Sequence, residues 1–326
     1  MLHKMRLSML ETMAVVLFAV LLCVSATGER AFAAGLPPFD SVLNDDDIRT
    51  LTKKYDKDGY ELFTKGLSRE EGLSVLVRLF YFTPETTNID AIDTYVHEAY
   101  HKCARLSSDP TLEGKEHEKM KIYVGDGNYI TVRFTKIFRS QDIAESIPQR
   151  FHRSNRFVTY VEDAGGELLS DWDGVYGLMN EFGGYCWGMH NVVSMFGYRD
   201  RFADTEATWK TFVSQGESNR AAYAEFRYYI LHYLRYAREH RPAIYKKILK
   251  NQAFRKAYTR LDARFTEDIK TYEKDLKLID TRLKRAGSSV RVKDMVSKSG
   301  VRSYYNSLQK ETAKKTYREI EELLRE

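Results

Sequence analysis

The residues that follow Thr205 constrain the fold most, because they carry one pattern, that of long helices, to the end of the chain. Charged residues and tyrosines recur there at helical spacing, which is typical of amphipathic helices packed against one another. Pro242 and the Gly-Ser-Ser segment at 287–289 separate these helices. The expected helices lie near 216–240, 252–286 and 303–326. We therefore predict an all-helical C-terminal region, residues 205–326.

Residues 35–204 mix helical patterns with patterns typical of strands. Between Lys119 and Phe138, apolar and polar residues alternate on both sides of a Gly-Asp-Gly-Asn turn, which predicts a β-hairpin. The segment Arg-Phe-Val-Thr-Tyr-Val-Glu at 156–162 is expected to form a third strand. The fold class that follows is α+β and predominantly helical, with a small antiparallel sheet or hairpin in this region and helices alone after it.

Helical patterns cover much of the remaining sequence before Thr205. Residues 45–82 have a mostly helical pattern, although the apolar run 73–82 fits a buried strand equally well. Helical character resumes at about residue 174. It is expected to stop near Gly197, because glycine is suited to a C-terminal cap.

The N-terminus has the features of a secretory signal peptide. Basic residues precede fourteen mostly apolar residues, 13–26, and small residues follow at 31–35. Because a membrane-spanning helix needs about 20 apolar residues, an uncleaved membrane anchor is the weaker alternative. We expect cleavage after Ala33 or Ala34, which removes residues 1–34. The expected product is a secreted or periplasmic protein with no stable membrane span after signal removal.

The formal net charge of +5 matters less than its distribution. Basic residues are mixed with acidic ones along the chain rather than gathered in arms or blocks, so no nucleic-acid partner is predicted. Cys103 and Cys186 are the cysteines that remain after signal removal, and they lack zinc-finger spacing. Nothing in the sequence indicates an oligomeric state.

The segment with the most specific chemistry is Thr-Tyr-Val-His-Glu-Ala-Tyr-His-Lys-Cys, residues 94–103. It lies within a predicted amphipathic helix, roughly 89–106, whose start at Thr87 and Asp90 resembles a capping box. Apolar residues recur along this helix at spacings of 4, 3 and 4, at Ile92, Val96, Ala99 and Cys103.

His97 and His101 are four residues apart, so on a helix both imidazoles lie on the same side, one turn apart. Two histidines bind one zinc ion with this spacing, and Glu98 is then offset toward the open coordination position. In that chemistry the metal lowers the pKa of a bound water. The carboxylate of Glu98 takes the proton and later delivers it to the leaving amine. The alternative is a chance pair of surface histidines.

The sequence His-Glu-Ala-Tyr-His resembles the zinc-binding motif of the zincin metallopeptidases. The resemblance implies that His97 and His101 bind zinc and that Glu98 is the general base. A metzincin would have glycine and histidine three and six residues after the second histidine, where this chain has Ala104 and Ser107. The motif is therefore more similar to that of the gluzincins, in which a glutamate on a later helix is the third ligand.

A second segment, residues 177–188, is expected to place several glycines and one glutamate on the same helix face. Glycines cost helix stability, about 1 kcal/mol each relative to alanine, and close packing is the usual compensation. The pair Asn180-Glu181 also resembles the Asn-Glu pair of some gluzincins, which implies Glu181 as the third zinc ligand. The alternative is plain helix packing with Glu181 at the rim. The residues on this face, at spacings of 4, 3 and 4, are Gly177, Glu181, Gly184 and Gly188. The rival third ligands are Glu162, Asp163, His152 and His190.

The chain departs from the gluzincin pattern in two places. Tyr185 occupies the position of an aspartate that often holds a ligand histidine in those enzymes. The spacing of 80 residues from His101 to Glu181 also exceeds the usual one, which implies that the hairpin and the third strand are inserted between the two ligand helices. Tyr185 is itself a candidate hydrogen-bond donor to the oxyanion that forms at a scissile carbonyl, with a core tyrosine as the alternative.

If the two ligand helices meet at a metal, a disulfide between Cys103 and Cys186 is geometrically plausible, and two buried free thiols are the alternative. The resemblance as a whole predicts a zincin-like, metal-binding catalytic domain at 35–204.

The predicted protein is an exported zinc-dependent metallohydrolase, specifically a peptidase that acts on a peptide or protein substrate. Amide hydrolysis rests on the resemblance, because the histidine spacing alone indicates only metal-assisted attack by water. The alternative function is that of a non-catalytic, exported, mainly helical binding protein.

Overall fold

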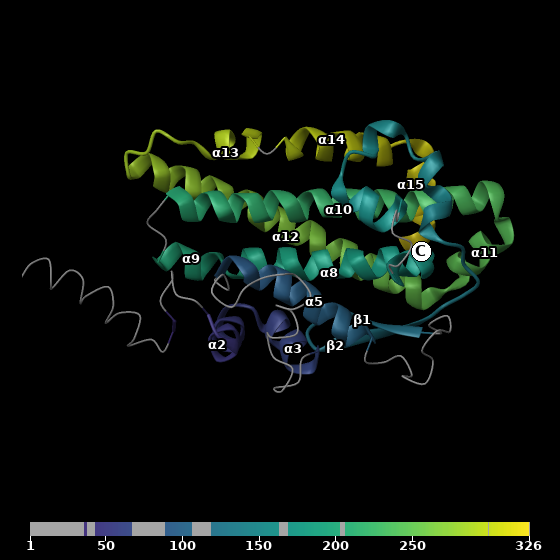
Figure 1. Ribbon diagram of the computed structural model, residues 1–326, viewed down its shortest axis with the longest axis horizontal. Coiled ribbons are helices and arrows are strands. Elements are labelled where there is room, and N and C mark those ends of the chain that lie inside the picture. Colours follow the sequence, from purple (N-terminus) through teal and green to yellow (C-terminus); the bar gives the residue numbers. More distant parts are fainter. Residues whose placement is uncertain are drawn as a thin grey trace, which may run out of the picture.

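The computed structural model describes residues 36–37, 43–66, 89–105, 119–162, 169–202, 206–298 and 300–325. The predicted signal peptide, the ambiguous run 73–82 and the capping residue Thr87 lie outside these ranges. Within them, the fold is predominantly helical with a single two-stranded antiparallel sheet (Figure 1). The α+β, predominantly helical prediction is confirmed to that extent.

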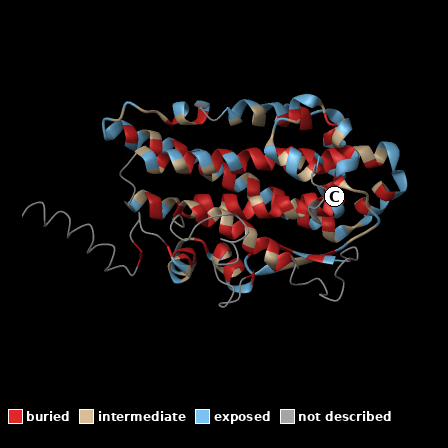
Figure 2. Ribbon diagram, in the orientation of Figure 1, coloured by how far each residue is buried: buried red, intermediate tan, exposed pale blue. Residues whose placement is uncertain are grey.

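Helix α8 (Gly174–Ser194) lies at the centre of the fold. Most of its residues are buried on every side of the helix (Figure 2). A helix that is apolar all round is stable only when other elements cover each of its faces. The helices that pack against it are α5 (Ile92–Arg105), α10 (Glu206–His240) and α12 (Gln252–Arg285).

Further helices cover this central group on two sides (Figure 1). On one side, α3 packs against α5 and α2 packs against α3. On the other side, three C-terminal helices pack against α10. These outer helices are α2 (Asp45–Tyr55), α3 (Lys57–Gly66), α13 (Val292–Lys298), α14 (Val301–Thr312) and α15 (Lys315–Arg325). The shorter helical segments are η2 (Ile89–Ala91), η4 (Ser140–Ser146), η5 (Gln149–Phe151), α7 (Leu169–Trp172), α9 (Phe196–Phe202) and α11 (Pro242–Lys250).

Local sequence explains where several helices begin. The side chain of Asn44 accepts a hydrogen bond from the backbone amide of Asp47 (2.9 Å). The carboxylate of Asp47 in turn accepts one from the backbone amide of Asn44 (3.1 Å), which completes a capping box at the start of α2. Asn251 caps α12 through the amide of Phe254. Pro242 is the first residue of α11, where its missing N–H costs nothing. The helices predicted near 216–240 and 252–286 are present as α10 and α12, although α10 begins earlier than predicted, at Glu206.

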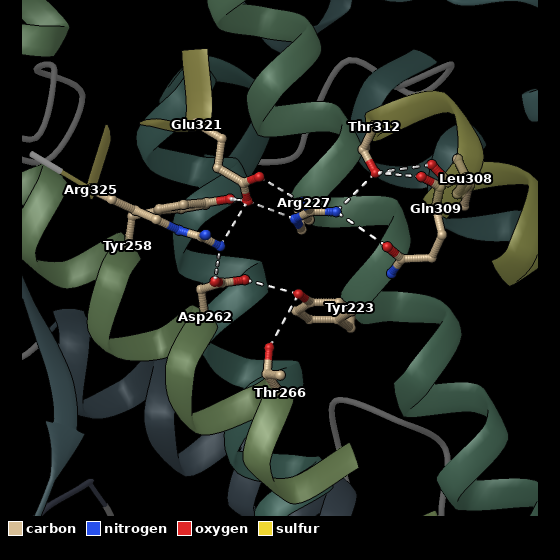
Figure 3. Close-up of polar contacts among 10 residues, drawn as sticks. All are labelled: Tyr223, Arg227, Tyr258, Asp262, Thr266, Leu308, Gln309, Thr312, Glu321 and Arg325. Carbon is tan, nitrogen blue, oxygen red and sulfur yellow. Dashed lines mark hydrogen bonds and ion pairs between the residues drawn. The ribbon is translucent and has the colours of Figure 1, made fainter. Parts of the chain in front are cut away.

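The single helix predicted at 303–326 is instead two helices, α14 and α15, with a break at Ala313 and Lys314. No glycine or proline marks this break in the sequence. Polar contacts on both sides of the break join α14 and α15 to α10 and α12 (Figure 3).

The Arg227 guanidinium on α10 is the centre of these contacts. It donates two hydrogen bonds to the Glu321 carboxylate on α15 (2.8 and 2.6 Å) and one to the Thr312 hydroxyl at the end of α14 (2.8 Å). On α15, Arg325 donates to Asp262 of α12 (2.7 Å). A paired arrangement of two N–H groups on one carboxylate is the strongest form of such a contact, so α15 is fixed by charge as well as by packing.

Two further predictions from the sequence are wrong. Residues 156–162 form no strand: α6 (Asn155–Phe157) continues into a π-helical turn, η6 (Val158–Glu162). The side chains that turn inward are Phe157, Tyr160 and Val161, and a spacing of three to four residues is helical rather than alternating. Gly197 caps no helix, because it lies inside α9. Helix α8 ends earlier, where the amide of Met195 bonds to the carbonyl of Asn191.

The predicted hairpin is confirmed. Its turn residues Gly125, Asp126 and Gly127 all have positive φ angles (96°, 53° and 72°), which favours glycine at two of the three positions. Asp58 at the start of α3 fixes this turn, because its carboxylate accepts hydrogen bonds from the Tyr123 hydroxyl (2.5 Å) and the Asp126 amide (2.9 Å). The two antiparallel strands are β1 (Lys119–Gly125) and β2 (Asn128–Arg133).

Two hydrophobic clusters fill the described part of the chain. The smaller one joins α2, α3 and α5. The larger one contains side chains from Met120 to Leu324, on both sides of the predicted boundary at residue 204. The division into domains at that residue stays a prediction. Among the described residues, no helix has both the length and the apolar character needed to cross a bilayer.

His190 on α8 joins the N-terminal helices to α12 through three carboxylates. Its Nδ1 atom lies 3.1 Å from Oδ1 of Asp268, and its Nε2 atom lies 3.5 Å from Asp58 and 3.7 Å from Asp56. Burial lowers the pKa of His190, but Asp268 and Asp56 raise it more, so that it lies above the ordinary 6.5 despite the opposing charge of Arg264. The raised pKa favours the imidazolium form of His190 among these carboxylates.

We expect this contact to make stability depend on pH. Because the folded-state pKa of His190 is raised, its contribution is complete below pH ~6.5 and is lost as the pH rises through the raised value. His190→Gln should lower the free energy of unfolding by roughly 3 kcal/mol at low pH, because it leaves buried carboxylates without their cation. It should also flatten the pH dependence. Urea unfolding across this pH range tests both effects, with exposed His240→Gln as the control. An unchanged pH slope in His190→Gln would contradict the assignment.

Candidate metal centre

The predicted helix at 89–106 is present as η2 followed by α5, and it brings His97 and His101 together on one side. Their Nε2 atoms are 2.8 Å apart, and the two rings meet edge to face with 4.6 Å between centroids. The residues are 8% and 7% exposed, so neither is a surface histidine. The interpretation of the motif as two surface histidines is therefore wrong.

Glu181 on α8 completes a cluster with these histidines. Its Oε2 atom lies 3.6 Å from Nε2 of His97 and 3.4 Å from Nε2 of His101. In tetrahedral zinc sites with bonds of 2.0–2.1 Å, ligand atoms are about 3.3 Å apart. The distances from the Glu181 oxygen to the two histidine nitrogens are close to that value, and the distance of 2.8 Å between the two nitrogens is somewhat shorter. Glu181 is only 8% exposed, so it does not lie at the rim of the helix interface, as one interpretation of the sequence had it.

The Oε2 atom of Glu181 is buried and has no hydrogen-bond partner. A buried carboxylate oxygen without a partner is costly unless a cation compensates it. Burial raises the pKa of Glu181, but the imidazoles of His101 and His97 lower it more, and it lies well below its ordinary value. The group is therefore an anion that faces two imidazole nitrogens, which is the donor set that zinc prefers. On this observation the three residues fit a zinc ion.

Two glycines of α8 make this approach possible. A Cβ atom on Gly184 would lie 2.9 Å from Nε2 of His97 and 3.0 Å from Nε2 of His101. A Cβ atom on Gly183 would lie 2.1 Å from the hydroxyl of Tyr100. Contacts this short are rare or absent for real Cβ atoms, so a larger residue at either position would require the Tyr100 ring or the two imidazoles to shift. The glycine-rich face was predicted to allow another helix to approach closely, and α5 does so at Gly183 and Gly184.

Glu98 faces a cleft beside these residues. The cleft has a volume of about 420 Å³. The Glu98 side chain is 18% exposed, and its Oε1 atom lies 3.8 Å from Nε2 of His97. His97 and Glu98 both line this cleft, so one histidine of the pair and the glutamate face the same open space. Other residues on its walls are Thr94, Arg156, Tyr160, Tyr185, Ser218 and Asn219.

Helix α10 forms the opposite wall and is tied to α5 through Asp93. The Asp93 carboxylate accepts hydrogen bonds from the side-chain amides of Gln215 (3.0 Å) and Asn219 (3.3 Å). Burial raises the pKa of Asp93, although the hydrogen bond from Asn219 opposes this. Since Asp93 lies one turn before His97, these contacts hold the start of the ligand helix at a fixed distance from α10.

Tyr185 lies where the sequence places it, one turn after Glu181. Its ring meets the His97 ring at 86° with 4.5 Å between centroids, and it also lines the cleft. Arg156 and Tyr160 line the same cleft, and sequence reasoning missed both because it assigned them to a strand. They are four residues apart, so a helical interpretation of 156–162 would have put them on one side.

Two of the rival third ligands that the structure describes have other partners, and a third is exposed. His152 is within 2.7 Å of the carbonyl of Ile147, His190 belongs to the aspartate cluster, and Glu162 is exposed. Asp163 lies outside the described residues.

Cys103 and Cys186 are both free and buried, so of the two alternatives left open by the sequence the structure has the free thiols. Their thiols contact the carbonyls of Leu62 and Leu261, on α3 and α12 respectively.

Neither a family model, nor a curated protein, nor a solved structure matches this chain. The resemblance to gluzincins therefore rests on the sequence motifs alone.

We expect Gly184→Ala to weaken zinc binding, because the new methyl group would displace both imidazoles. A loss of roughly 10- to 100-fold in affinity is expected, comparable to disturbing the groups that orient metal ligands. Competition with a chromophoric chelator measures it. Gly197→Ala is a matched control, since its Cβ would make only an ordinary 3.9 Å contact with Tyr55. Equal zinc affinity in both variants would contradict the proposed arrangement.

Proposed function

We propose that this protein is an exported zinc-dependent hydrolase that cleaves peptide bonds, with His97, His101 and Glu181 as its zinc ligands. The observation that carries the proposal is the buried Oε2 atom of Glu181, which has no hydrogen-bond partner and faces two imidazole nitrogens from another helix. Three such ligands leave a fourth position open, as catalytic zinc sites require. Export follows from the signal-peptide features of residues 1–34.

A zinc ion held by these side chains would supply Lewis acidity toward a water molecule and a substrate carbonyl. Glu98 supplies the general base. Its carboxylate lies at the cleft wall next to His97, so it can take a proton from the attacking water and then pass it to the leaving amine. Its partial exposure keeps it accessible to both groups.

Tyr185 is the proposed donor to the oxyanion that develops on the scissile carbonyl. Its ring lies beside His97 and its side chain lines the same cleft as Glu98. A donor aimed at developing charge lowers the barrier without binding the ground state more tightly.

A peptide is the substrate that suits the walls of this cleft. Side-chain hydroxyl and amide groups of Thr94, Ser218 and Asn219 line it, and the described walls include no aliphatic side chain. Such groups offer hydrogen-bond donors and acceptors to a peptide backbone, which has both at every residue. The resemblance of the histidine motif to that of gluzincins supports the same substrate class.

Glu98→Gln tests this function, because it removes the base and leaves the ligands unchanged. We expect it to retain zinc and to lower the turnover of a fluorogenic peptide library by roughly 100- to 10,000-fold. Exposed Glu322→Gln is the control and should match the parent. If the parent shows no chelator-sensitive hydrolysis of the library, the peptidase proposal fails, and the alternative of a helical binding protein takes its place.

A further inference from the structure

Arg156 projects from α6 into the cleft and is held firmly there by α10. Its guanidinium donates to the Glu225 carboxylate (3.0 Å), to the Ser218 hydroxyl (2.9 Å) and to the Ser218 carbonyl (3.3 Å). The Glu225 residue is completely buried, while the Arg156 side chain is 18% exposed at the cleft. These three hydrogen bonds hold the guanidinium in one position at the cleft.

The same guanidinium lies over the face of the Tyr185 ring, 4.6 Å from its centroid. Burial lowers the pKa of Arg156, but Tyr185 and Glu225 raise it more, so the group remains a cation. The Nε atom of Arg156 is buried and has no hydrogen-bond partner, so part of its donor capacity is unused within the fold. Besides bracing α6 against α10 through Glu225 and Ser218, the guanidinium therefore interacts directly with Tyr185, which lines the cleft.

Tyr185 is enclosed on three sides. Arg156 covers one face of its ring, Phe226 stacks on it at 5.3 Å and 27°, and His97 meets it at 86°. These contacts leave the ring little freedom to rotate. A cation over an aromatic face also draws electron density from the ring. For a phenol, this makes the O–H group a stronger hydrogen-bond donor, and in a partly buried site the effect is not screened by water.

We propose that Arg156 is a positioning residue for the hydrolytic reaction, which holds Tyr185 in place and strengthens its hydroxyl as the donor to the developing oxyanion. This inference rests on the proposed peptidase function. It assigns Arg156 no contact with substrate. Its effect should appear in the transition state alone, since the negative charge that Tyr185 meets exists only there. The expected signature is a lower kcat with little change in KM.

A double-mutant cycle with Arg156→Met and Tyr185→Phe tests the proposal, using the best peptide from the library. Tyr185→Phe should lower kcat by roughly 100-fold, the effect of losing one oxyanion donor. Arg156→Met should lower kcat by about tenfold with KM within about twofold, and it should add less than about twofold in the Tyr185→Phe background. Arg156→Lys retains the charge but not the planar fork, so its kcat should lie between those of Arg156→Met and the parent.

Arg150→Met is a matched control, because Arg150 also lies over an aromatic ring, that of Phe151 at 4.5 Å, and pairs with a glutamate, Glu311 at 2.6 Å, away from the cleft. The zinc content and thermal unfolding of every variant are measured, so that a loss of kcat caused by misfolding is recognised. If Arg156→Met is misfolded, the kcat of Arg156→Lys tests the proposal instead. The affinity for a phosphinic analogue of the same peptide, measured by calorimetry, provides a readout independent of turnover. Arg156→Met should weaken this affinity when the Tyr185 hydroxyl is present and should have little effect in the Tyr185→Phe background.

Three results would overturn the inference: an equal loss of kcat from Arg156→Met with and without the Tyr185 hydroxyl, a rise in KM at constant kcat, or no change at all. The failure of the proposed function has a different signature, because the parent would then show no hydrolysis that depends on zinc and Glu98.

Discussion

The close approach of α5 to α8 is the constraint on which the site depends. Packed helices are usually 8–10 Å apart because side chains separate their backbones. At Gly183 and Gly184 that layer is absent, and Tyr100 and the two histidines occupy the space instead. Only this allows a carboxylate on one helix to reach imidazoles on another while all three are almost completely buried. The glycines lower the intrinsic stability of α8, and burial of the helix by its neighbours compensates for it.

The rest of the fold serves to hold these two helices in register. Asp93 ties α5 to α10, His190 ties α8 to the N-terminal helices and to α12, and Arg227 ties the last helix to α10. Each contact involves a charged group that is mostly buried, so each is sensitive to the loss of its partner. Side chains held on packed helices of this kind keep a fixed geometry, which both metal binding and catalysis require.

Much of the site could be predicted because its residues share a helical face within one segment. The spacing of His97 and His101, and that of Glu181 and Gly184, follow from the helical period alone, and both helices were recognisable from their apolar and glycine patterns. The two long helices α10 and α12 were recognisable for the same reason.

What the sequence could not provide are the features set by contacts between distant segments. The segment 156–162 is short and rich in valine and aromatic residues, so its local preference suits a strand, yet it forms α6 and η6, which pack against η4 and α10. The position of Arg156 depends on Glu225 and Ser218, which lie on that later helix. In the same way, no local glycine or proline marks the break at Ala313, whereas Arg227 contacts residues on both sides of it.

The most direct test of the central claim is the zinc content of residues 35–326 after exhaustive dialysis, measured by elemental analysis beside the Glu181→Ala variant. The account predicts about one zinc ion per chain in the parent and a sharp loss in the variant, because two histidines alone hold zinc weakly. No zinc in the parent, even after reconstitution with the metal, would contradict it.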